Sequence, residues 1–315
     1  MKRIALMLLL IGAVAYGAIA IYHHHLRQVD SIAGVRPEIL PDGFESFVEL
    51  SKSIRKLHEK KKPVQPGDWL EAHPEGGQSF AQYVLARATK PLKDEFSTIY
   101  FQPLGDFDET QRRIVDQTSE FLGLYFGMKV QLLEAKPLGE IPETARRMRN
   151  DTEQVLTPWI LKDRLLPDRP EDAVAVIGLV TCDLWPGDLG FVFGSASLVD
   201  RVGVWSLYRN GDPRESEAAY RLSLKRTLKT AVHETGHMLG IPHCVEYECC
   251  MNGSNSRAES DQRPFEFCPE CQPKIWWTCG TNAASRSHNL AEFAKCHVMS
   301  DEATFWKKQT EKLSK

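Results

Sequence analysis

The stretch that decides the fold is HETGHMLGIPH, which runs from His233 to His243. Residues four apart on a helix lie one above the other, so His233 and His237 can present two imidazoles to one ion. Gly240 tolerates the backbone conformation that ends a helix, and the chain can then turn to bring in His243. The spacing therefore predicts a three-histidine metal site where a helix ends.

Three protein ligands leave the fourth position of a tetrahedral zinc for water, which is the arrangement of a catalytic site. Zinc lowers the pKa of such a water to about 7. Glu234 directly follows the first histidine, so it can take the proton from this water as a general base and pass it to a leaving amine. Each histidine alone would more simply be a hydrogen-bonded or exposed imidazole, but the set as a whole predicts a catalytic zinc.

The helix that carries this motif is expected to begin near Asp212. Asp212 suits the N-cap, Pro213 the first helical position and Glu215 the reciprocal capping position. Four apolar residues fall on one face of this helix, which we expect to pack against a sheet: Leu224, Leu228, Ala231 and Leu239. His233 and His237 lie roughly opposite, on the face that points away from the sheet.

A second metal site is indicated by cysteines that follow the third histidine. The chain holds eight cysteines, and four of them have the spacing of a tetrahedral zinc site: Cys244, Cys249, Cys268 and Cys271. The alternative is a set of disulfides, which an exported chain would favour. The CPEC stretch from Cys268 to Cys271 favours metal, because a bridge between cysteines three apart is strained or redox-active.

The other four cysteines have weaker assignments. Cys250 adjoins a predicted ligand and could replace Cys249 by a shift of one residue. Cys182, Cys279 and Cys296 belong to no motif, so we expect them to pack in the core, with a disulfide among them as the alternative.

The extended signature from His233 to His243 is that of the metzincins, and the cysteines after it resemble one branch, the archaemetzincins. This resemblance implies a zinc peptidase with two zinc ions per chain, one catalytic and one structural at the four cysteines. It also implies that Met251 is the Met-turn residue beneath the catalytic metal. An edge strand around Phe193 and Gly194 would align the substrate backbone by strand addition, the alternative being a plain core strand.

The alternation of elements predicts an α/β fold. Strands are expected at residues 97–105, 129–135, 173–181, 191–197 and 202–209, and helices at 109–127 and 152–166. Together with the resemblance, this predicts an α+β metzincin-like fold: a twisted mixed five-stranded sheet with backing helices and an active-site helix below it. A small cysteine-rich carboxyl-terminal subdomain would hold the second zinc.

The amino terminus carries an apolar run from Ile4 to Tyr22. As a helix it would span about 28 Å, close to the thickness of a membrane. Residues 1–25 are therefore either a transmembrane anchor, which the length favours, or a signal peptide cleaved near Ala18 and Ala20. Either interpretation places the remaining chain on the exported side, membrane-anchored or secreted.

The remaining chain is divided into an amino-terminal extension at 26–95 and a catalytic domain at 96–315. A formal net charge of -3 excludes a strongly basic nucleic-acid binder, so the expected partners are a peptide or protein substrate and, through the apolar run, a membrane. The predicted function is a zinc metallopeptidase. The alternatives are a zinc-stabilised binding protein without turnover, which the intact Glu234 disfavours, and a zinc hydrolase of a non-peptide bond.

Overall fold

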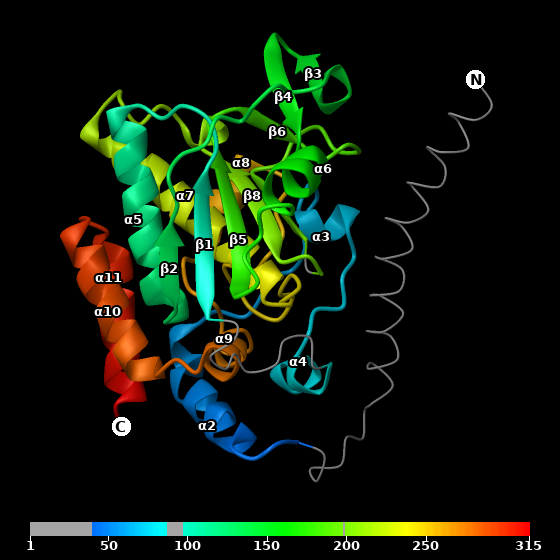
Figure 1. Ribbon diagram of the computed structural model, residues 1–315. Helices are drawn as coiled ribbons and strands as arrows, with labels where there is room; N and C mark the ends of the chain where they lie inside the picture. Colours follow the sequence, from blue (N-terminus) through cyan, green and yellow to red (C-terminus); the bar gives the residue numbers. More distant parts are fainter. Residues whose placement is uncertain (1–39, 87–96, 198) are drawn as a thin grey trace.

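The computed structural model describes residues 40–86 and 97–315, with the exception of residue 198. A five-stranded sheet in the order β2-β1-β5-β8-β7 forms its centre (Figure 1). Its strands are β1 (Thr98–Pro103), β2 (Lys129–Leu132), β5 (Ala173–Val180), β7 (Gly194–Ser197) and β8 (Val202–Ser206). The first four strands in this order run parallel to one another, and β7 lies at the edge, antiparallel to β8. The predicted mixed five-stranded sheet is confirmed.

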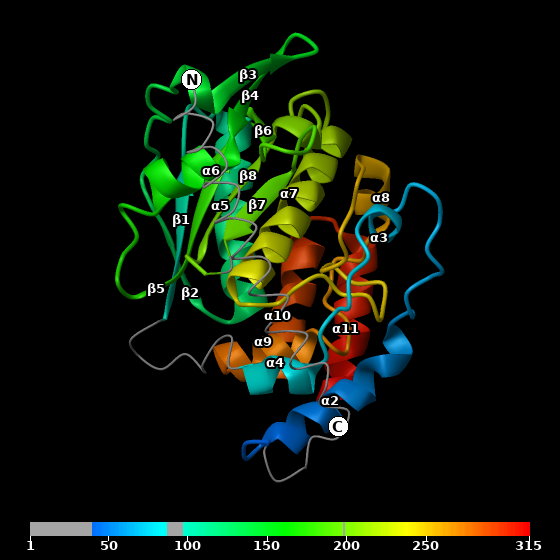
Figure 2. The same ribbon diagram turned by 90° about the vertical axis from the view of Figure 1, so that its right-hand side faces the viewer.

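The central strand β5 is buried along its whole length, as its continuous apolar sequence predicts. On one face of the sheet, Ile177 and Trp205 share a core with the helices α5 (Glu109–Phe126) and α7 (Glu217–Met238). On the other face, Val176 and Val204 pack with the π-helical segment η4 (Ile160–Leu165). Figure 2 shows α7 running alongside the sheet. The sheet is therefore covered on both faces, and α7 is held rigidly against one of them.

The expected helix at 152–166 is wrong in its first half. Thr152–Leu156 is a strand, β4, which pairs antiparallel with β3 (Arg146–Arg149) and parallel with β6 (Asp183–Trp185). Asn150 and Asp151 have positive φ angles of 47° and 59°, so they form the two-residue turn that joins β3 to β4. Helical structure begins only at α6 (Thr157–Trp159) and continues through η4.

The active-site helix α7 begins later than expected. Its N-cap is Ser216, whose hydroxyl accepts a hydrogen bond from the amide of Ala219. The carboxylate of Asp212 is instead occupied by Arg214, which donates from its backbone amide and its guanidinium. Asp212 therefore closes a local turn, and the cap falls to the next residue with a suitable hydroxyl.

Most of the remaining helices come from the two ends of the chain, and two short 3-10 segments lie in its middle. They are α2 (Phe44–Ile54), η2 (Arg55–Leu57), α3 (Trp69–Ala72), α4 (Phe80–Ala86), η3 (Glu143–Ala145), η5 (Tyr208–Asn210), α8 (Arg257–Gln262), α9 (Gln272–Cys279), α10 (Ala283–Cys296) and α11 (Ser300–Leu313). Phe44 of α2 stacks on Phe80 of α4, and both rings belong to the same core as α5 and α7. Trp277 of α9 lies edge-on to Phe80 and Phe47. The amino-terminal segment is thus packed onto the carboxyl-terminal helices (Figure 1).

The expectation of a membrane-anchored or exported chain is corrected. Within residues 40–86 and 97–315, residue 198 aside, no helix is long and apolar enough to cross a membrane. The longest helix, α7, carries charged side chains such as Lys225 and Lys229 along its length, which a membrane-spanning helix excludes. The run from Ile4 to Tyr22, on which the expectation depends, lies outside the described residues.

Candidate active site

The structure brings the three predicted histidines together at the end of α7. The Nε2 atoms of His233 and His237 lie 3.1 Å apart. Gly240, with a φ of 81°, ends the helix and turns the chain so that His243 joins them. One ligand atom from each histidine lies within 4.8 Å of the others. Nitrogen ligands around a tetrahedral zinc are about 3.3 Å apart, so the cluster fits one ion.

The Nδ1 atom of each imidazole is already engaged. His233 Nδ1 lies 2.8 Å from the carbonyl oxygen of Cys250, and His237 Nδ1 lies 2.8 Å from that of Ile241. Because a carbonyl oxygen only accepts, both Nδ1 atoms must carry the proton, and each Nε2 keeps a free lone pair. His243 Nδ1 contacts the carboxylate of Glu75 at 2.9 Å. All three rings therefore present Nε2 as the metal-binding atom.

Burial holds the imidazoles of His233 and His237 neutral, which is the form that binds metal. The pKa of His233 is well below its usual value, first because the side chain is buried and then because His237 lies beside it. Burial, with His243 as the second cause, lowers the pKa of His237 to about 3. The nitrogen lone pairs of these two rings are therefore not protonated and remain free to bind a cation.

Glu234 lies on the same helical turn as His233, and its side chain is almost entirely buried. Burial raises the pKa of this carboxyl to about 8, with Arg263 acting in the opposite direction. A Cβ atom at Gly194 would lie 2.8 Å from Oε1 of Glu234, so the backbone of the edge strand β7 runs against the carboxylate. Two of the predicted site residues, Glu234 and Gly194, are therefore neighbours.

Phe193 does not join this cluster. It directly precedes β7, and the guanidinium of Arg257 lies 3.8 Å from the centre of its ring. The ring therefore packs against α8, while the neighbouring Gly194 faces the active-site helix.

Met251 lies directly beneath the active-site helix and is completely buried. A Cβ atom at Gly236, between the first two histidines, would lie 2.6 Å from the sulfur of Met251 and 2.9 Å from the ring of Phe267. A residue larger than glycine would therefore not fit at position 236 without movement of its neighbours. Met251 packs against α7 at the level of the histidines.

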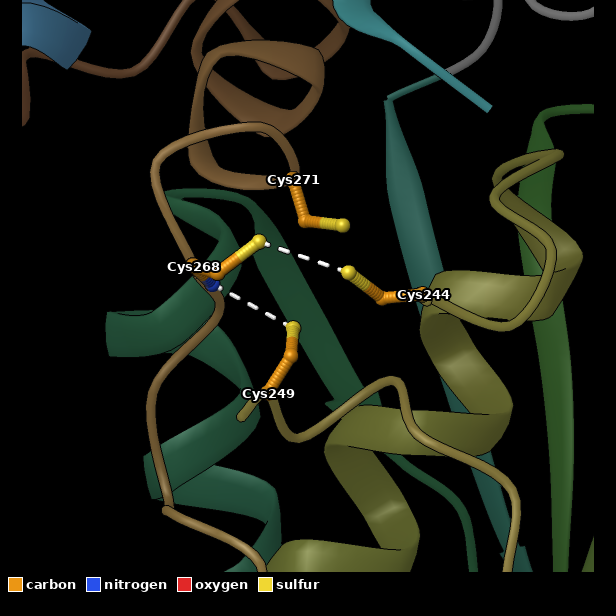
Figure 3. Close-up of side chains that lie close together, drawn as sticks. All are labelled: Cys244, Cys249, Cys268 and Cys271. Carbon is orange, nitrogen blue, oxygen red and sulfur yellow. Dashed lines mark hydrogen bonds between the residues drawn. The ribbon is translucent and has the colours of Figure 1, made fainter. Parts of the chain in front are cut away.

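The second predicted cluster also forms, with Cys244, Cys249, Cys268 and Cys271 all buried (Figure 3). The Sγ atoms of Cys244 and Cys268 lie 3.5 Å apart. A disulfide would bring them to about 2.05 Å, whereas thiolates around a tetrahedral zinc lie about 3.8 Å apart. All eight cysteines of the chain are free thiols. The arrangement fits a four-cysteine metal site.

Two of the clustered sulfurs differ in how readily they lose a proton. Hydrogen bonds from Cys249, Cys268 and Cys271 hold the pKa of Cys244 well below its usual value. Burial, followed by the hydrogen bond with Cys244, raises the pKa of Cys249 well above it. A cation among the sulfurs is what would allow all four to bind as thiolates.

The remaining cysteines lie apart from this cluster. The sulfur of Cys250 contacts the carbonyl of Lys229, and its own carbonyl accepts from His233, so it does not replace Cys249. Cys182 and Cys279 are half-buried, and Cys296 is exposed. A disulfide among these three does not form.

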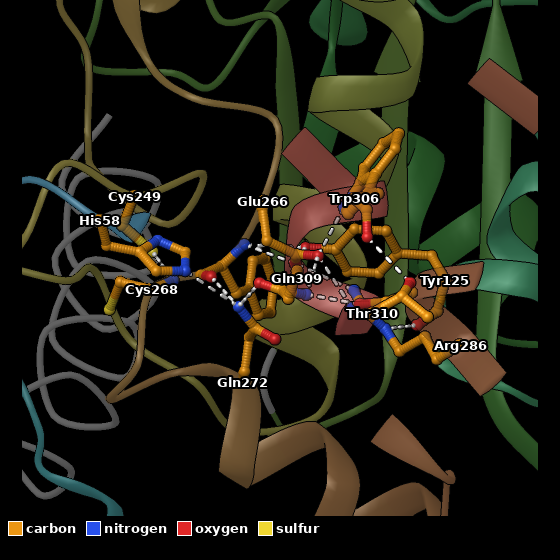
Figure 4. Close-up of polar contacts among 12 residues, drawn as sticks. His58, Tyr125, Cys249, Glu266, Cys268, Gln272, Arg286, Trp306, Gln309 and Thr310 are labelled. Atoms are coloured by element: carbon orange, nitrogen blue, oxygen red, sulfur yellow. Dashed lines mark hydrogen bonds and ion pairs between the residues drawn. The ribbon is translucent and has the colours of Figure 1, made fainter. Parts of the chain in front are cut away.

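A buried ion pair fixes the cysteine loop to the helices behind it (Figure 4). The carboxylate of Glu266, two residues before Cys268, receives hydrogen bonds from Arg286 at 2.8 and 2.9 Å. Tyr125 of α5 and Trp306 of α11 donate to the same carboxylate, each at 2.7 Å. Burial alone would raise the pKa of Glu266, but Arg286 more than offsets it, and the group stays ionised.

Two contributors to the site were missed from the sequence. Glu75, which contacts His243, lies in the amino-terminal extension at 26–95, to which no site residue was assigned. The buried Arg263 donates to the carbonyl of Asn252 and to Ser260, close to the Met251 turn, and no spacing marks it as special. The signal that could have drawn attention to Glu75 is the pair Trp69 and Glu75 in an otherwise polar loop.

Known proteins resemble this chain along much of its length. The model of Peptidase family M54 matches residues 165–276. Archaemetzincin-2 of Macaca fascicularis and of Homo sapiens are each 32% identical over 261 residues, covering 72% of this chain and 72% of the relative. Archaemetzincin of Thermococcus kodakarensis is 36% identical over 112 residues, covering 34% of this chain and 58% of the relative.

A solved structure also aligns with the fold. The crystal structure of archaemetzincin from Methanopyrus kandleri has a TM-score of 0.49 and 27% sequence identity, covering 60% of this chain and 99% of that chain. The matched family residues 165–276 include all three histidines, Glu234 and the four clustered cysteines. The resemblance predicted from the sequence is confirmed, as are the peptidase activity, the use of zinc and the peptide or protein nature of the substrate. The chain belongs to the archaemetzincins of peptidase family M54 and is a zinc metallopeptidase.

Proposed function

We propose that His233, His237 and His243 hold a catalytic zinc and that Glu234 is the general base and acid of peptide hydrolysis. The observation that carries this proposal is the set of three imidazoles whose Nδ1 atoms are engaged and whose Nε2 atoms converge beside a buried carboxylate. When bound, zinc acts there as a Lewis acid that acidifies water and polarises the scissile carbonyl.

Glu234 moves the proton. Among the residues that the structure describes, no side chain donates a hydrogen bond to its carboxyl group, so in its ionised form an oxygen of Glu234 is available to take a proton from water. The same oxygen then gives that proton to the nitrogen of the leaving amine as the C–N bond breaks. Burial keeps bulk water from competing for the carboxylate.

The substrate backbone is proposed to align along β7. This strand is the edge of the sheet, with its partner β8 on one side only, so its other edge is suited to an added strand. Support comes from Gly194, whose backbone runs against Glu234. A peptide paired with β7 would lie beside the general base. Phe193 would only help to anchor β7 beside the substrate, since its ring packs under Arg257 and its carbonyl oxygen accepts from the amide of Ser206 in β8.

The four-cysteine cluster is proposed to hold a second, structural zinc, giving two zinc ions per chain. Four buried sulfurs with a spacing suited to zinc support it. Four protein ligands leave no position for water, so this site would stabilise the fold and do no chemistry. Met251 would support the catalytic helix from below.

We further propose a catalytic domain at 96–315 and an extension at 26–95. The described part of the extension does not form a core of its own, because Phe44, Phe80 and Tyr83 belong to the core of α5 and α7. The described part of the extension is therefore proposed to fold together with the catalytic domain as one unit.

The decisive experiment compares wild type with Glu234→Gln and with Glu215→Ala, a carboxylate removed from an exposed position before the same helix. Glu234→Gln should keep two zinc ions per chain by metal analysis and lose peptide turnover by about 10²–10⁴-fold. Glu215→Ala should resemble wild type in both. Undiminished chelator-sensitive turnover by Glu234→Gln would overturn the assigned role.

A further inference from the structure

Glu75, from the amino-terminal segment, reaches across to the third zinc-ligand candidate. Its two carboxylate oxygens lie 2.9 and 3.0 Å from Nδ1 of His243, 168 positions later in the chain. The indole of Trp69 donates to Oε1 of Glu75 at 3.0 Å, and its ring lies edge-on to the imidazole of His243. Trp69 thus orients the carboxylate of Glu75, and this carboxylate in turn orients the imidazole of His243.

The segment that carries Glu75 is held on both sides. Before it, the amide of Trp69 donates to Glu259 at 2.9 Å, and the indole packs so closely on Gly253 that no side chain would fit there. After it, the buried ammonium of Lys274 donates to the carbonyl of Gln78 at 2.6 Å. Glu75 is therefore placed by the fold and does not move freely in a surface loop.

His243 differs from the other two histidines in how its ring is fixed. His233 and His237 use backbone carbonyls, that of Cys250 in the cysteine loop and that of Ile241 in the turn after α7. His243 lies beyond the end of α7, and its Nδ1 contact comes from a distant side chain. A carboxylate on the far nitrogen fixes the tautomer and makes the near nitrogen a better ligand.

We propose that Glu75 is a positioning residue, which holds His243 so that Nε2 faces the catalytic metal, and that the amino-terminal extension thereby completes the active site. This inference rests on the proposed function, because it needs His243 to be a zinc ligand. Glu75 does not touch the substrate; it acts through the imidazole. Trp69 has the auxiliary task of keeping the carboxylate turned towards the ring.

The test measures zinc affinity by competition with a chelator for wild type, Glu75→Ala, Glu75→Gln and the control Glu59→Ala. Glu59 lies on the same segment, its side chain is 76% exposed, and its ion pair with Lys62 is long, at 3.9 Å. Glu75→Ala should lower the affinity for the catalytic zinc by about 10–100-fold, the range found when hydrogen-bond partners of metal-bound histidines are removed. Glu75→Gln should lose less, because its amide oxygen still accepts from Nδ1. Glu59→Ala should match wild type.

Cobalt substitution separates the two metal sites. Cobalt on four thiolates absorbs strongly in the near ultraviolet, and this band should be the same in all variants, so a loss confined to the weaker visible bands marks the histidine site. A change in the thiolate band of Glu75→Ala would indicate general damage and would count against the proposal.

A double-mutant cycle with His243→Ala completes the design. If Glu75 acts through His243, the loss of zinc affinity caused by Glu75→Ala should vanish in the His243→Ala background. An equal loss in both backgrounds, or wild-type affinity in Glu75→Ala, would overturn the proposal. Failure of the proposed function is distinguishable: there, His243→Ala itself would leave the zinc content and affinity of the protein unchanged.

Discussion

The backbone of Gly194 lies against the carboxylate of Glu234, at a distance that leaves no room for a methyl group between them. The strand proposed to align the substrate and the residue proposed to move the proton are therefore in direct contact. This contact sets how far a substrate paired with β7 stands from the general base.

Gly194→Ala should lower peptide turnover by about 10–100-fold, because the added Cβ, 2.8 Å from Oε1, must displace Glu234. Zinc content and the unfolding midpoint should stay close to wild type. Steady-state kinetics on one peptide checks this, with Gly76→Ala as the control, since a Cβ there meets nothing within 4 Å. Equal turnover in the two variants would argue against the contact.

Gly236→Ala should destabilise the protein by about 1–3 kcal/mol, since its Cβ would overlap Met251 and Phe267. Intrinsic helix propensity would favour alanine by about 1 kcal/mol, so a loss of stability can only come from packing. Gly123→Ala in α5 is the matched control, because its Cβ would meet neighbours at 3.4 Å or more. Urea unfolding of both variants gives the comparison, and a stabilised Gly236→Ala would be inconsistent with the support assigned to Met251.

Removal of metal should expose the cysteine cluster. With zinc bound, Cys244, Cys249, Cys268 and Cys271 should resist a thiol reagent, and after chelation these four thiols should become reactive. The exposed Cys296 serves as an internal control and should react in both states. The reactive positions can be identified by mass spectrometry of labelled peptides. A cluster that resists the reagent equally before and after chelation would speak against structural zinc.

Glu266→Gln should be among the most destabilising single changes, at about 3–5 kcal/mol, because it leaves Arg286 as an unpaired charge in the core. Glu49→Gln, which disrupts an exposed pair with Lys52, should change stability by less than about 1 kcal/mol. Denaturant unfolding in matched buffers measures both. Similar values for the two variants would mean that the buried pair contributes no more than a surface pair.

The half-buried His58 should make the fold sensitive to acid. Its pKa lies below 6.5 mainly because burial disfavours the charged ring, while Glu266 and Gln309 act in the opposite direction. The unfolded chain therefore takes up a proton near pH 6.5 that the folded chain refuses, so stability is lost as the pH falls below this value. The melting temperature of wild type should fall towards that of His58→Gln between pH 7 and pH 5, in about the range where histidine titrates. A constant difference would contradict the assignment.

Local patterns were enough for most of the fold. The eight buried residues of β5 and the apolar face of α5 follow from short-range periodicity, and the five-stranded sheet was predicted correctly. The three histidines and four cysteines were found because their spacing alone limits where they can lie. These features depend on residues close together in the chain.

Some of the errors involve distant partners. Thr152–Leu156 is a strand because it pairs with β3 through the turn at Asn150 and Asp151 and with β6 from about thirty residues away; no local pattern indicates the second pairing. The contact between Glu75 and His243 spans 168 positions, and nothing in the residues around Glu75 indicates it. Such contacts are set by how elements pack, and the sequence of either partner alone does not encode them.

His243 and Cys244 are consecutive in the chain, yet they belong to different clusters. A single peptide bond thus links the two clusters, so the backbone positions of His243 and Cys244 depend on each other. How the cysteine loop is anchored influences where His243 lies, and the turn after α7 influences where Cys244 lies. A change at either cluster is therefore expected to disturb the geometry of the other.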